Sequence, residues 1–185
     1  MINTDAAVQA FCRENDISIF LSHDMPAGYE DAYGTYDVTV NTLFLNTALL
    51  QDAQEEELLF TLYHELRHAV QYLHPERFDE RIQTSRFYVI LFDGRCFKLN
   101  GNAWLSCQLE GTEDMFSSAY LSLPYELDAN RYACEKVQSL CGATPLLKEL
   151  CAFWLPEETV RSEEMEKLFA RIDAALNIPE NTGNQ

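Results

Sequence analysis

The pattern of hydrophobic and polar positions predicts a mixed α+β chain. Strands are expected where short runs of apolar and β-branched residues occur, at 17–21, 36–40 and 43–45. Helices are expected where apolar residues recur at a helical period, at 4–14, 52–73, 124–140, 145–153 and 160–176. Thr4 and Asp52 are the expected caps of the first two helices. A turn or bulge near Asn41 should separate two strands, and Pro75 should end the second helix.

The length and composition suit one folded domain. The 185 residues are 47% hydrophobic, which is enough to bury a core without disulfide staples. No internal repeat or long linker is visible, so we expect residues 1–185 to form a single domain with a frayed tail at 179–185. The first residues lack the basic and apolar stretches of a secretory signal, and no apolar run approaches the roughly 18 residues of a membrane span.

Charge and cysteine usage narrow the expected partners. The formal net charge is -17, from 30 acidic and 13 basic residues. Such a surface repels phosphate backbones and anionic lipids, so we expect neither nucleic acid nor a membrane as a partner. The cysteines are widely spaced, with no Cys-x-x-Cys pair, which favours reduced and mostly buried thiols in a cytoplasmic protein. They are Cys12, Cys96, Cys107, Cys134, Cys141 and Cys151.

The strongest chemical signal is a His-Glu-x-x-His motif inside the predicted 52–73 helix, formed by His64, Glu65 and His68. Two histidines four residues apart lie on one helical face, so both imidazoles can reach one zinc ion. Glu65 is turned by about 100° from His64, which places its carboxylate beside the metal rather than on it. A general base that deprotonates a zinc-activated water must lie there. The alternative is two ordinary core histidines beside a surface glutamate.

Two residues compete for the role of third metal ligand. His74 follows His68 by six residues, the spacing of metzincins, but Gln71 occupies the position at which that family needs a helix-ending glycine. On an unbroken helix His74 would point about 120° away from His68 and would act as a helix C-terminal cation. Glu126 lies on the predicted helix from Pro124, and it is the better candidate.

Asn130 follows Glu126 by four residues and shares its helical face. It could therefore donate or accept a hydrogen bond with an imidazole that binds the metal. The small residues Ala129 and Ala133 would let this helix pack closely against the motif helix. The alternative for Glu126 is an ordinary surface glutamate that the helix dipole favours.

These two motifs resemble those of the gluzincins, and more narrowly those of the compact ImmA/IrrE-type metallopeptidases and related minimal gluzincins. The likeness covers roughly residues 15–141 and includes a strand near 38–45 that corresponds to an edge strand. It implies a zincin-like α+β fold, in which a small sheet with an edge strand lies beside two active-site helices. Zinc would be bound by His64, His68 and Glu126, and Glu65 would be catalytic. Arg67 and Asn130 depart from the family pattern, which usually has Gly and often Asp at these positions.

The resemblance predicts a zinc endopeptidase that acts on a specific protein or peptide, and a separately encoded regulator is one candidate for this substrate. Glu65 would accept the proton of the attacking water and pass it to the leaving amine. Tyr132 and Tyr125 are candidates for assisting the oxyanion, and the substrate strand could pair with the strand near 39–45. Two alternatives remain: a zincin-fold interaction module with little or no turnover, and a metzincin-like peptidase that uses His74.

The segment 76–123 is longer than the matching part of compact gluzincins, so we expect it to be an insertion. Runs of aromatic and β-branched residues at 87–92 and 95–99 flank an Asp-Gly pair, which is typical of a tight hairpin. Apolar residues on both faces of this hairpin should pack on the body of the protein or on a partner. We expect the insertion to border the cleft and restrict substrate entry; the alternative is a purely structural extension of the sheet.

Overall fold

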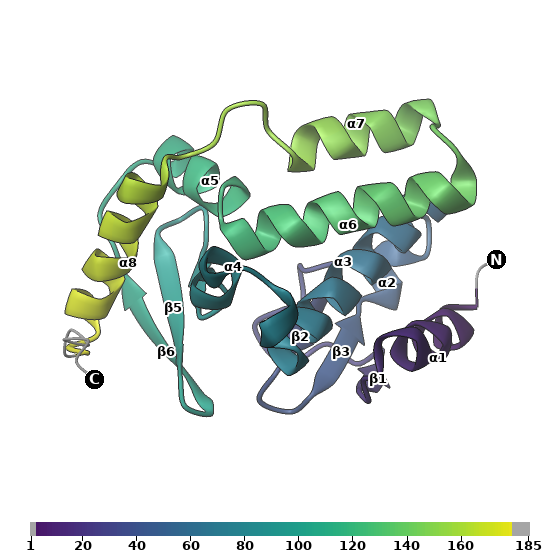
Figure 1. The fold of residues 1–185 in the computed structure, drawn as a ribbon, viewed down its shortest axis with the longest axis horizontal. Helices are drawn as coiled ribbons and strands as arrows, with labels where there is room; N and C mark the ends of the chain where they lie inside the picture. Colours follow the sequence, from purple (N-terminus) through teal and green to yellow (C-terminus); the bar gives the residue numbers. More distant parts are fainter. Residues whose placement is uncertain (1–2, 179–185) are drawn as a thin grey trace.

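A computed structural model describes residues 3–178 and confirms a mixed α+β architecture with two three-stranded sheets. Figure 1 shows one sheet near the N-terminal helix and the other near the last helix, with long helices passing between and above them. The predicted tail at 179–185 lies outside the described residues. Within residues 3–178, none of the helices combines the length and apolar character needed to cross a bilayer.

The first sheet is mixed, with β1 (Phe20–Ser22) parallel and β2 (Gly34–Asp37) antiparallel to β3 (Thr42–Leu45). The predicted turn at Asn41 is confirmed, since this residue has a φ of 50° between β2 and β3. The prediction that the 38–45 strand is an edge strand is wrong: the order is β1-β3-β2, so β3 is the central strand and β2 lies at one edge. Alternating hydrophobicity identifies strands but carries no information about which strands are neighbours.

Helix α3 (Glu55–Leu73) carries the His-Glu-x-x-His motif. It packs against β2 and β3 and is longer than any strand of the first sheet. Its cap is Gln54, which forms a reciprocal capping box with Glu57, rather than the predicted Asp52. Asp52 is displaced because a short helix, α2 (Thr47–Leu50), occupies the preceding residues. The helix ends before Pro75 as predicted, and the chain continues into the 3-10 turn η1 (Pro75–Arg77).

Helix α6 (Pro124–Cys141) packs along α3 and supplies the second half of the candidate site. Pro124 lies at its first turn, where a missing N–H costs no hydrogen bond, and Gly142 ends it with a φ of 80°. Ala129 and Ala133 are fully buried, which confirms the expected close approach of the two helices.

The segment 76–123 contains the predicted hairpin and more structure than the sequence suggested. Strands β4 (Tyr88–Ile90) and β5 (Arg95–Asn100) pair antiparallel around Gly94, which has a φ of 82°. A third strand, β6 (Ala103–Gln108), pairs with β5. Helix α4 (Glu80–Ser85) packs on α6, and helix α5 (Glu113–Leu121) packs on β4; both were missed because they are short.

The remaining helices match their predicted positions. They are α1 (Thr4–Asn15), α7 (Pro145–Trp154) and α8 (Ser162–Ala175). The cap of α1 is Asn3 rather than Thr4, because the Asn3 side chain accepts the N–H of Ala6. Helix α7 folds back against α6, and α8 packs on β5 and β6.

Two hydrophobic cores lie on either side of the candidate site. One is built on the first sheet, α1 and α3, and the other on the second sheet, α5 and α8. Helix α6 contributes to both, with Tyr125 in the second core and Val137 in the first. Figure 1 shows α6 passing above both groups of elements. The start of α6 is therefore held where the two cores meet.

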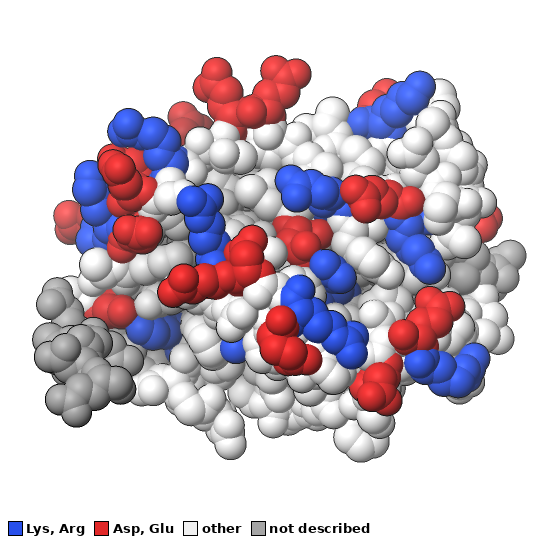
Figure 2. All heavy atoms as spheres, in the orientation of Figure 1, with Lys and Arg blue, Asp and Glu red and all other residues white. Residues whose placement is uncertain are grey.

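The cysteines and surface charges add two findings. The expectation that all cysteines are reduced is wrong for Cys134 and Cys151, which form a disulfide between α6 and α7. The antiparallel packing of these helices brings the two Cα atoms to 5.9 Å, a separation that sequence spacing did not reveal. On the face shown in Figure 2, Lys and Arg side chains are interspersed with Asp and Glu.

Candidate metal centre

The motif histidines lie one helical turn apart on the face of α3 that α6 covers. The Nε2 atoms of His64 and His68 are 3.0 Å apart. Both residues are buried, with 9% and 7% of their surfaces exposed. The predicted sharing of one face is therefore confirmed, and both rings direct a nitrogen to one point.

Glu126 reaches the same point from the first turn of α6. Its Oε2 atom lies 3.3 Å from Nε2 of His64 and 3.6 Å from Nε2 of His68. One ligand atom from each of these three residues lies within 4.8 Å of the others. The structure thus brings together the three residues that the sequence predicted as ligands.

The cluster fits a bound zinc ion. Two imidazole nitrogens and one carboxylate oxygen form a donor set that catalytic zinc uses, with a fourth position left open. Oε2 of Glu126 is buried and makes no hydrogen bond within residues 3–178, although both rings are close. A cation among the three donor atoms would satisfy a polar atom that the protein leaves unpaired.

The electrostatics of the metal-free cluster favour a bound proton. Burial disfavours the charged imidazolium of His68, but the Glu126 carboxylate outweighs it and raises the pKa of His68 to about 9. Burial also opposes ionisation of Glu126, yet the two imidazoles hold the pKa of Glu126 well below its ordinary value.

The raised pKa of His68 sets the direction of the pH dependence. Its pairing stabilises the metal-free fold fully below about pH 6.5, the ordinary histidine pKa, and this stabilisation is lost as the pH rises through about 9. A metal ion at Nε2 must displace this proton, so metal binding strengthens as the pH rises toward that value.

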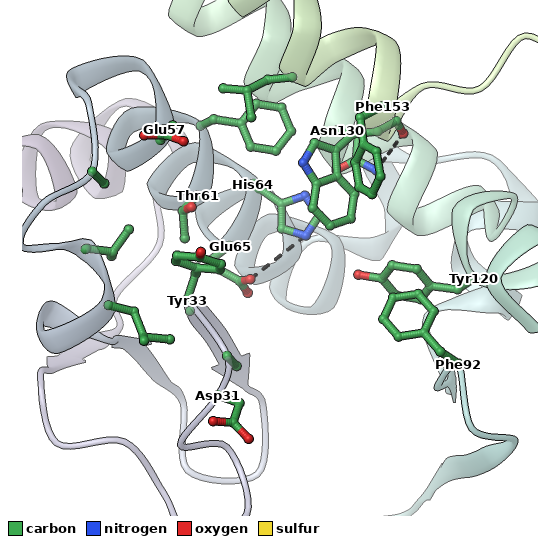
Figure 3. A pocket seen from close by; sticks show the side chains of 18 of the residues that line it. Asp31, Tyr33, Glu57, Thr61, His64, Glu65, Phe92, Tyr120, Asn130 and Phe153 are labelled. Atoms are coloured by element: carbon green, nitrogen blue, oxygen red, sulfur yellow. Dashed lines mark hydrogen bonds and ion pairs between the residues drawn. The ribbon is translucent and has the colours of Figure 1, made fainter. Parts of the chain in front are cut away.

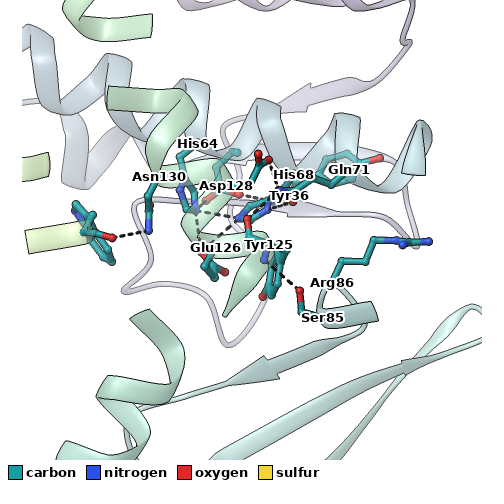
Figure 4. A network of polar contacts seen from close by, with 12 residues as sticks. Tyr36, His64, His68, Gln71, Ser85, Arg86, Tyr125, Glu126, Asp128 and Asn130 are labelled. Atoms are coloured by element: carbon teal, nitrogen blue, oxygen red, sulfur yellow. Dashed lines mark hydrogen bonds and ion pairs between the residues drawn. The ribbon is translucent and has the colours of Figure 1, made fainter. Parts of the chain in front are cut away.

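Gln71 fixes the orientation of His68, a role that the sequence analysis missed. Its Oε1 lies 2.8 Å from Nδ1 of His68. Its amide nitrogen donates to the carbonyl of Tyr125 at 2.8 Å and to Asp128 at 2.9 Å. Both amide hydrogens are therefore used, so Oε1 must be the atom that faces His68. The ring then carries its hydrogen on Nδ1, which leaves Nε2 free for a metal (Figure 4).

Arg67 anchors this arrangement from the outer side. Its guanidinium donates two hydrogen bonds to Asp128, at 2.7 and 3.1 Å, and stacks over the rings of Phe78 and Tyr132. The Asp128 carboxylate therefore accepts hydrogen bonds from both Arg67 and Gln71. Arg67, which departs from the gluzincin pattern, thus orients polar groups behind His68. The role of Gln71 could have been inferred from the sequence, because a polar side chain three residues after His68 lies on the same, buried face of α3.

Replacing Gln71 with methionine should weaken zinc binding by about 10- to 100-fold, the usual effect of losing a hydrogen bond to a metal-ligating histidine. At a pH above about 9, where His68 of the metal-free protein is neutral, nitrogen-15 NMR should also show that its hydrogen is no longer held on Nδ1 alone. The control is Ser122→Ala, which removes another buried hydrogen bond, to the backbone of Val160, away from the cluster. An unchanged zinc affinity and tautomer in Gln71→Met would contradict this role.

Glu65 lies beside the cluster and not within it. Its Oε1 is 3.9 Å from Nε2 of His64, and its Oε2 accepts the backbone N–H of Tyr36 at 2.9 Å. Strand β2 can approach this closely because Gly34 has no side chain; a Cβ there would lie 3.1 Å from Cγ of Glu65. The carboxylate is therefore held by the sheet edge, with one oxygen turned toward His64, as a general base requires.

Two predicted site residues behave differently from the ligands. Asn130 donates from Nδ2 to the carbonyl of Trp154 at 3.1 Å, and no hydrogen bond joins it to His64 or His68 within residues 3–178. Its Oδ1 and Nδ1 of His64 are both buried and without hydrogen-bond partners in this part of the chain. His74 is outside the cluster: it caps the end of α3 and contacts Glu76.

The cluster opens onto a cavity of about 760 Å³ that His64 and Glu65 help to line. Ile90, Leu91, Phe92 and Tyr120 also line it, so the segment 76–123 borders the cavity as expected. In Figure 3 the Tyr120 hydroxyl points into the space facing His64 and Glu65. Neither tyrosine that was a candidate for assisting the oxyanion is part of the lining: Tyr132 packs beneath Arg67, and Tyr125 packs against His68.

Comparisons with known proteins identify no relative of this chain. No protein-family profile, curated protein or solved structure matches the chain. The donor cluster, the neighbouring carboxylate and the cavity are therefore the observations from which a function can be inferred.

Proposed function

We propose that the protein is a zinc-dependent endopeptidase of gluzincin type, with zinc bound by His64, His68 and Glu126. The observation that carries this proposal is the convergence of three buried donor atoms beside a fixed carboxylate at the wall of a cavity. Two packed helices with these motifs and a sheet edge beside Glu65 support a zincin-like arrangement. A hydrophobic core with a purely structural role would not require a buried glutamate beside two histidines.

Bound zinc would supply Lewis acidity, which acidifies a water molecule and polarises a peptide carbonyl. Glu65 accepts the proton of the attacking water and passes it to the leaving amine. The hydrogen bond from Tyr36 leaves Oε1 of Glu65 free for this transfer. Gln71 keeps Nε2 of His68 unprotonated once the metal is bound, because Nδ1 carries the hydrogen.

The substrate backbone would lie along β2 rather than along the predicted 39–45 strand. Strand β2 is at the edge of its sheet, and Gly34 lines the cavity next to Glu65. An extended peptide that pairs with this edge would pass its carbonyl groups across the cluster. Strand β3 cannot serve, since both of its edges are already paired.

Tyr120 would stabilise the developing oxyanion. Burial, followed by the carboxylates of Glu126 and Glu65, raises the pKa of Tyr120 well above its ordinary value, so its hydroxyl stays a neutral donor. The variant Tyr120→Phe should lose about 100- to 1,000-fold in kcat while zinc affinity stays unchanged. Steady-state kinetics with a metal assay test this role, and a kcat equal to that of the unsubstituted protein would refute it.

Cleavage of a complex peptide mixture tests the proposal as a whole. Zinc-loaded protein should generate new peptide termini that mass spectrometry detects, and a chelator should abolish them. Zinc binding without any cleavage of peptides or folded proteins would instead support the interaction-module alternative.

A further inference from the structure

A series of aromatic rings extends from the predicted metal ligand His64 into the cavity. The ring of Phe60 stacks on His64 with a centroid distance of 6.2 Å, and Trp154 stacks on Phe60 at 6.3 Å. Tyr120 and Phe153 pack edge-on against Trp154, at 6.5 and 4.9 Å. Each of these residues lines the cavity. Helices α3, α5 and α7 therefore bring their rings together at Trp154, two ring contacts away from His64.

Part of this ring surface is open to solvent. Phe92 packs edge-on against Tyr120 at 5.4 Å, and the two rings lie side by side in Figure 3. Phe92 is 48% exposed and Phe153 is 63% exposed, and neither belongs to the hydrophobic cores found among residues 3–178. Exposed rings at a concave surface gain free energy by burying an apolar group. We call the five residues that form this surface the aromatic pocket: Phe60, Phe92, Tyr120, Phe153 and Trp154.

Helix α6 fixes the position of the aromatic pocket relative to the metal centre. Asn130 donates a hydrogen bond from Nδ2 to the carbonyl of Trp154 at 3.1 Å, and it lies one helical turn after Glu126. The disulfide between Cys134 and Cys151 ties α7 to α6 one turn further along. Because these rings are held in place before a substrate arrives, little conformational entropy is lost when they bind one.

The resemblance to gluzincins does not imply this pocket. The likeness covers roughly residues 15–141, so α7 with Phe153 and Trp154 lies beyond it. Phe92 and Tyr120 belong to the segment 76–123, which is longer than the matching part of compact gluzincins. Four of the five rings therefore come from parts of the chain that the shared motifs do not specify. Two of them come from the segment that was expected to restrict substrate entry.

We propose that the aromatic pocket binds an aromatic side chain, Phe, Tyr or Trp, of the residue next to the scissile bond of the substrate. This inference rests on the proposed hydrolysis and names its substrate class. Aromatic rings prefer edge-on or offset contacts with centroids about 4.5–7 Å apart, and the pocket residues already adopt this geometry with one another. An entering ring gains such contacts in addition to its buried area, whereas an aliphatic side chain gains only the area.

The pocket selects the residue next to the bond because the ring series begins at a predicted metal ligand. Phe60 contacts His64 directly, so the pocket lies beside the point at which the scissile carbonyl would be bound. Each further residue of an extended peptide moves the side chain by about 3.3 Å and turns it to the opposite side of the backbone. A side chain several residues from the bond would therefore lie beyond the rings.

Selection of a phage-displayed random peptide library on Glu65→Gln protein incubated with excess zinc tests the pocket without requiring cleavage. Enriched peptides should share a Phe, Tyr or Trp. One enriched peptide, labelled with fluorescein, then gives a dissociation constant by anisotropy. Replacing its aromatic residue with leucine should weaken binding by about 2- to 10-fold, and replacing it with alanine by about 10- to 100-fold.

Matched variants locate the preference within the protein. The double variant Phe92→Ser, Phe153→Ser should bind the aromatic peptide about tenfold more weakly and should no longer distinguish it from the alanine peptide. The control Phe20→Ser, Leu140→Ser removes two apolar side chains of similar exposure outside the cavity, so it should keep both the affinity and the discrimination. All four side chains are exposed, so both hydrophobic cores stay intact in either variant.

The outcomes that would overturn the inference are distinct from failure of the hydrolysis. Enriched peptides without aromatic residues, a preference for Lys or Arg, or an equal loss of affinity in both double variants would each overturn it. Cleavage of the peptide mixture only at bonds without a neighbouring aromatic residue would overturn the pocket and leave the metallopeptidase proposal standing. If the protein binds no zinc and cleaves nothing but keeps the aromatic preference, the ligand class holds and the metallopeptidase proposal fails.

Discussion

Replacing Glu65 with glutamine should abolish peptide hydrolysis while zinc stays bound and the fold stays intact. Glutamine keeps the shape of the side chain and can still accept the N–H of Tyr36, but it cannot take the proton of a water molecule. General-base catalysis contributes about 10²- to 10⁴-fold, so kcat should fall by at least that range. Cleavage of a peptide found in the mixture assay measures the loss, and metal analysis measures zinc retention.

Glu76→Gln is the matched control for this substitution. Glu76 is an exposed glutamate that contacts His74 at the far end of α3, outside the cavity. Its loss should leave kcat unchanged. Undiminished turnover in Glu65→Gln would show that another group activates the water, and the role assigned to Glu65 would be wrong.

Replacing Glu126 with alanine should weaken zinc binding by more than 100-fold, because only two protein ligands would remain. The substitution also leaves His68 without the carboxylate that faces it in a buried site. His74→Ala is the control, since His74 caps α3 and contacts Glu76 and the backbone of Asp16. Competition with a chromogenic chelator gives both affinities. Loss of zinc in His74→Ala with retention in Glu126→Ala would favour the metzincin-like alternative.

The parts of the site that the sequence predicted are those set by local periodicity. His64 and His68 share a face because a helix repeats every 3.6 residues, and that helix was recognisable from its apolar pattern and from Pro75. Glu126 was within reach because Pro124 starts its helix and Ala129 allows close packing. Each inference needed only the residues of one segment and its neighbours.

The parts that were missed depend on contacts between distant segments. Tyr120 reaches the cavity from α5, a short helix whose position follows from the packing of the second core. Gln71 gained its role only through Asp128 and Tyr125, more than fifty residues later. The order of the first sheet and the disulfide were likewise invisible, because both follow from which elements become neighbours in space.

The zinc content of the protein after reconstitution tests the central claim most directly. Folded protein is incubated with excess zinc, freed of unbound metal by gel filtration, and analysed by mass spectrometry for zinc per chain. The three converging ligands predict about one zinc per chain. A content near zero in correctly folded protein would contradict the account, since His64, His68 and Glu126 would then form a buried polar cluster that binds no metal.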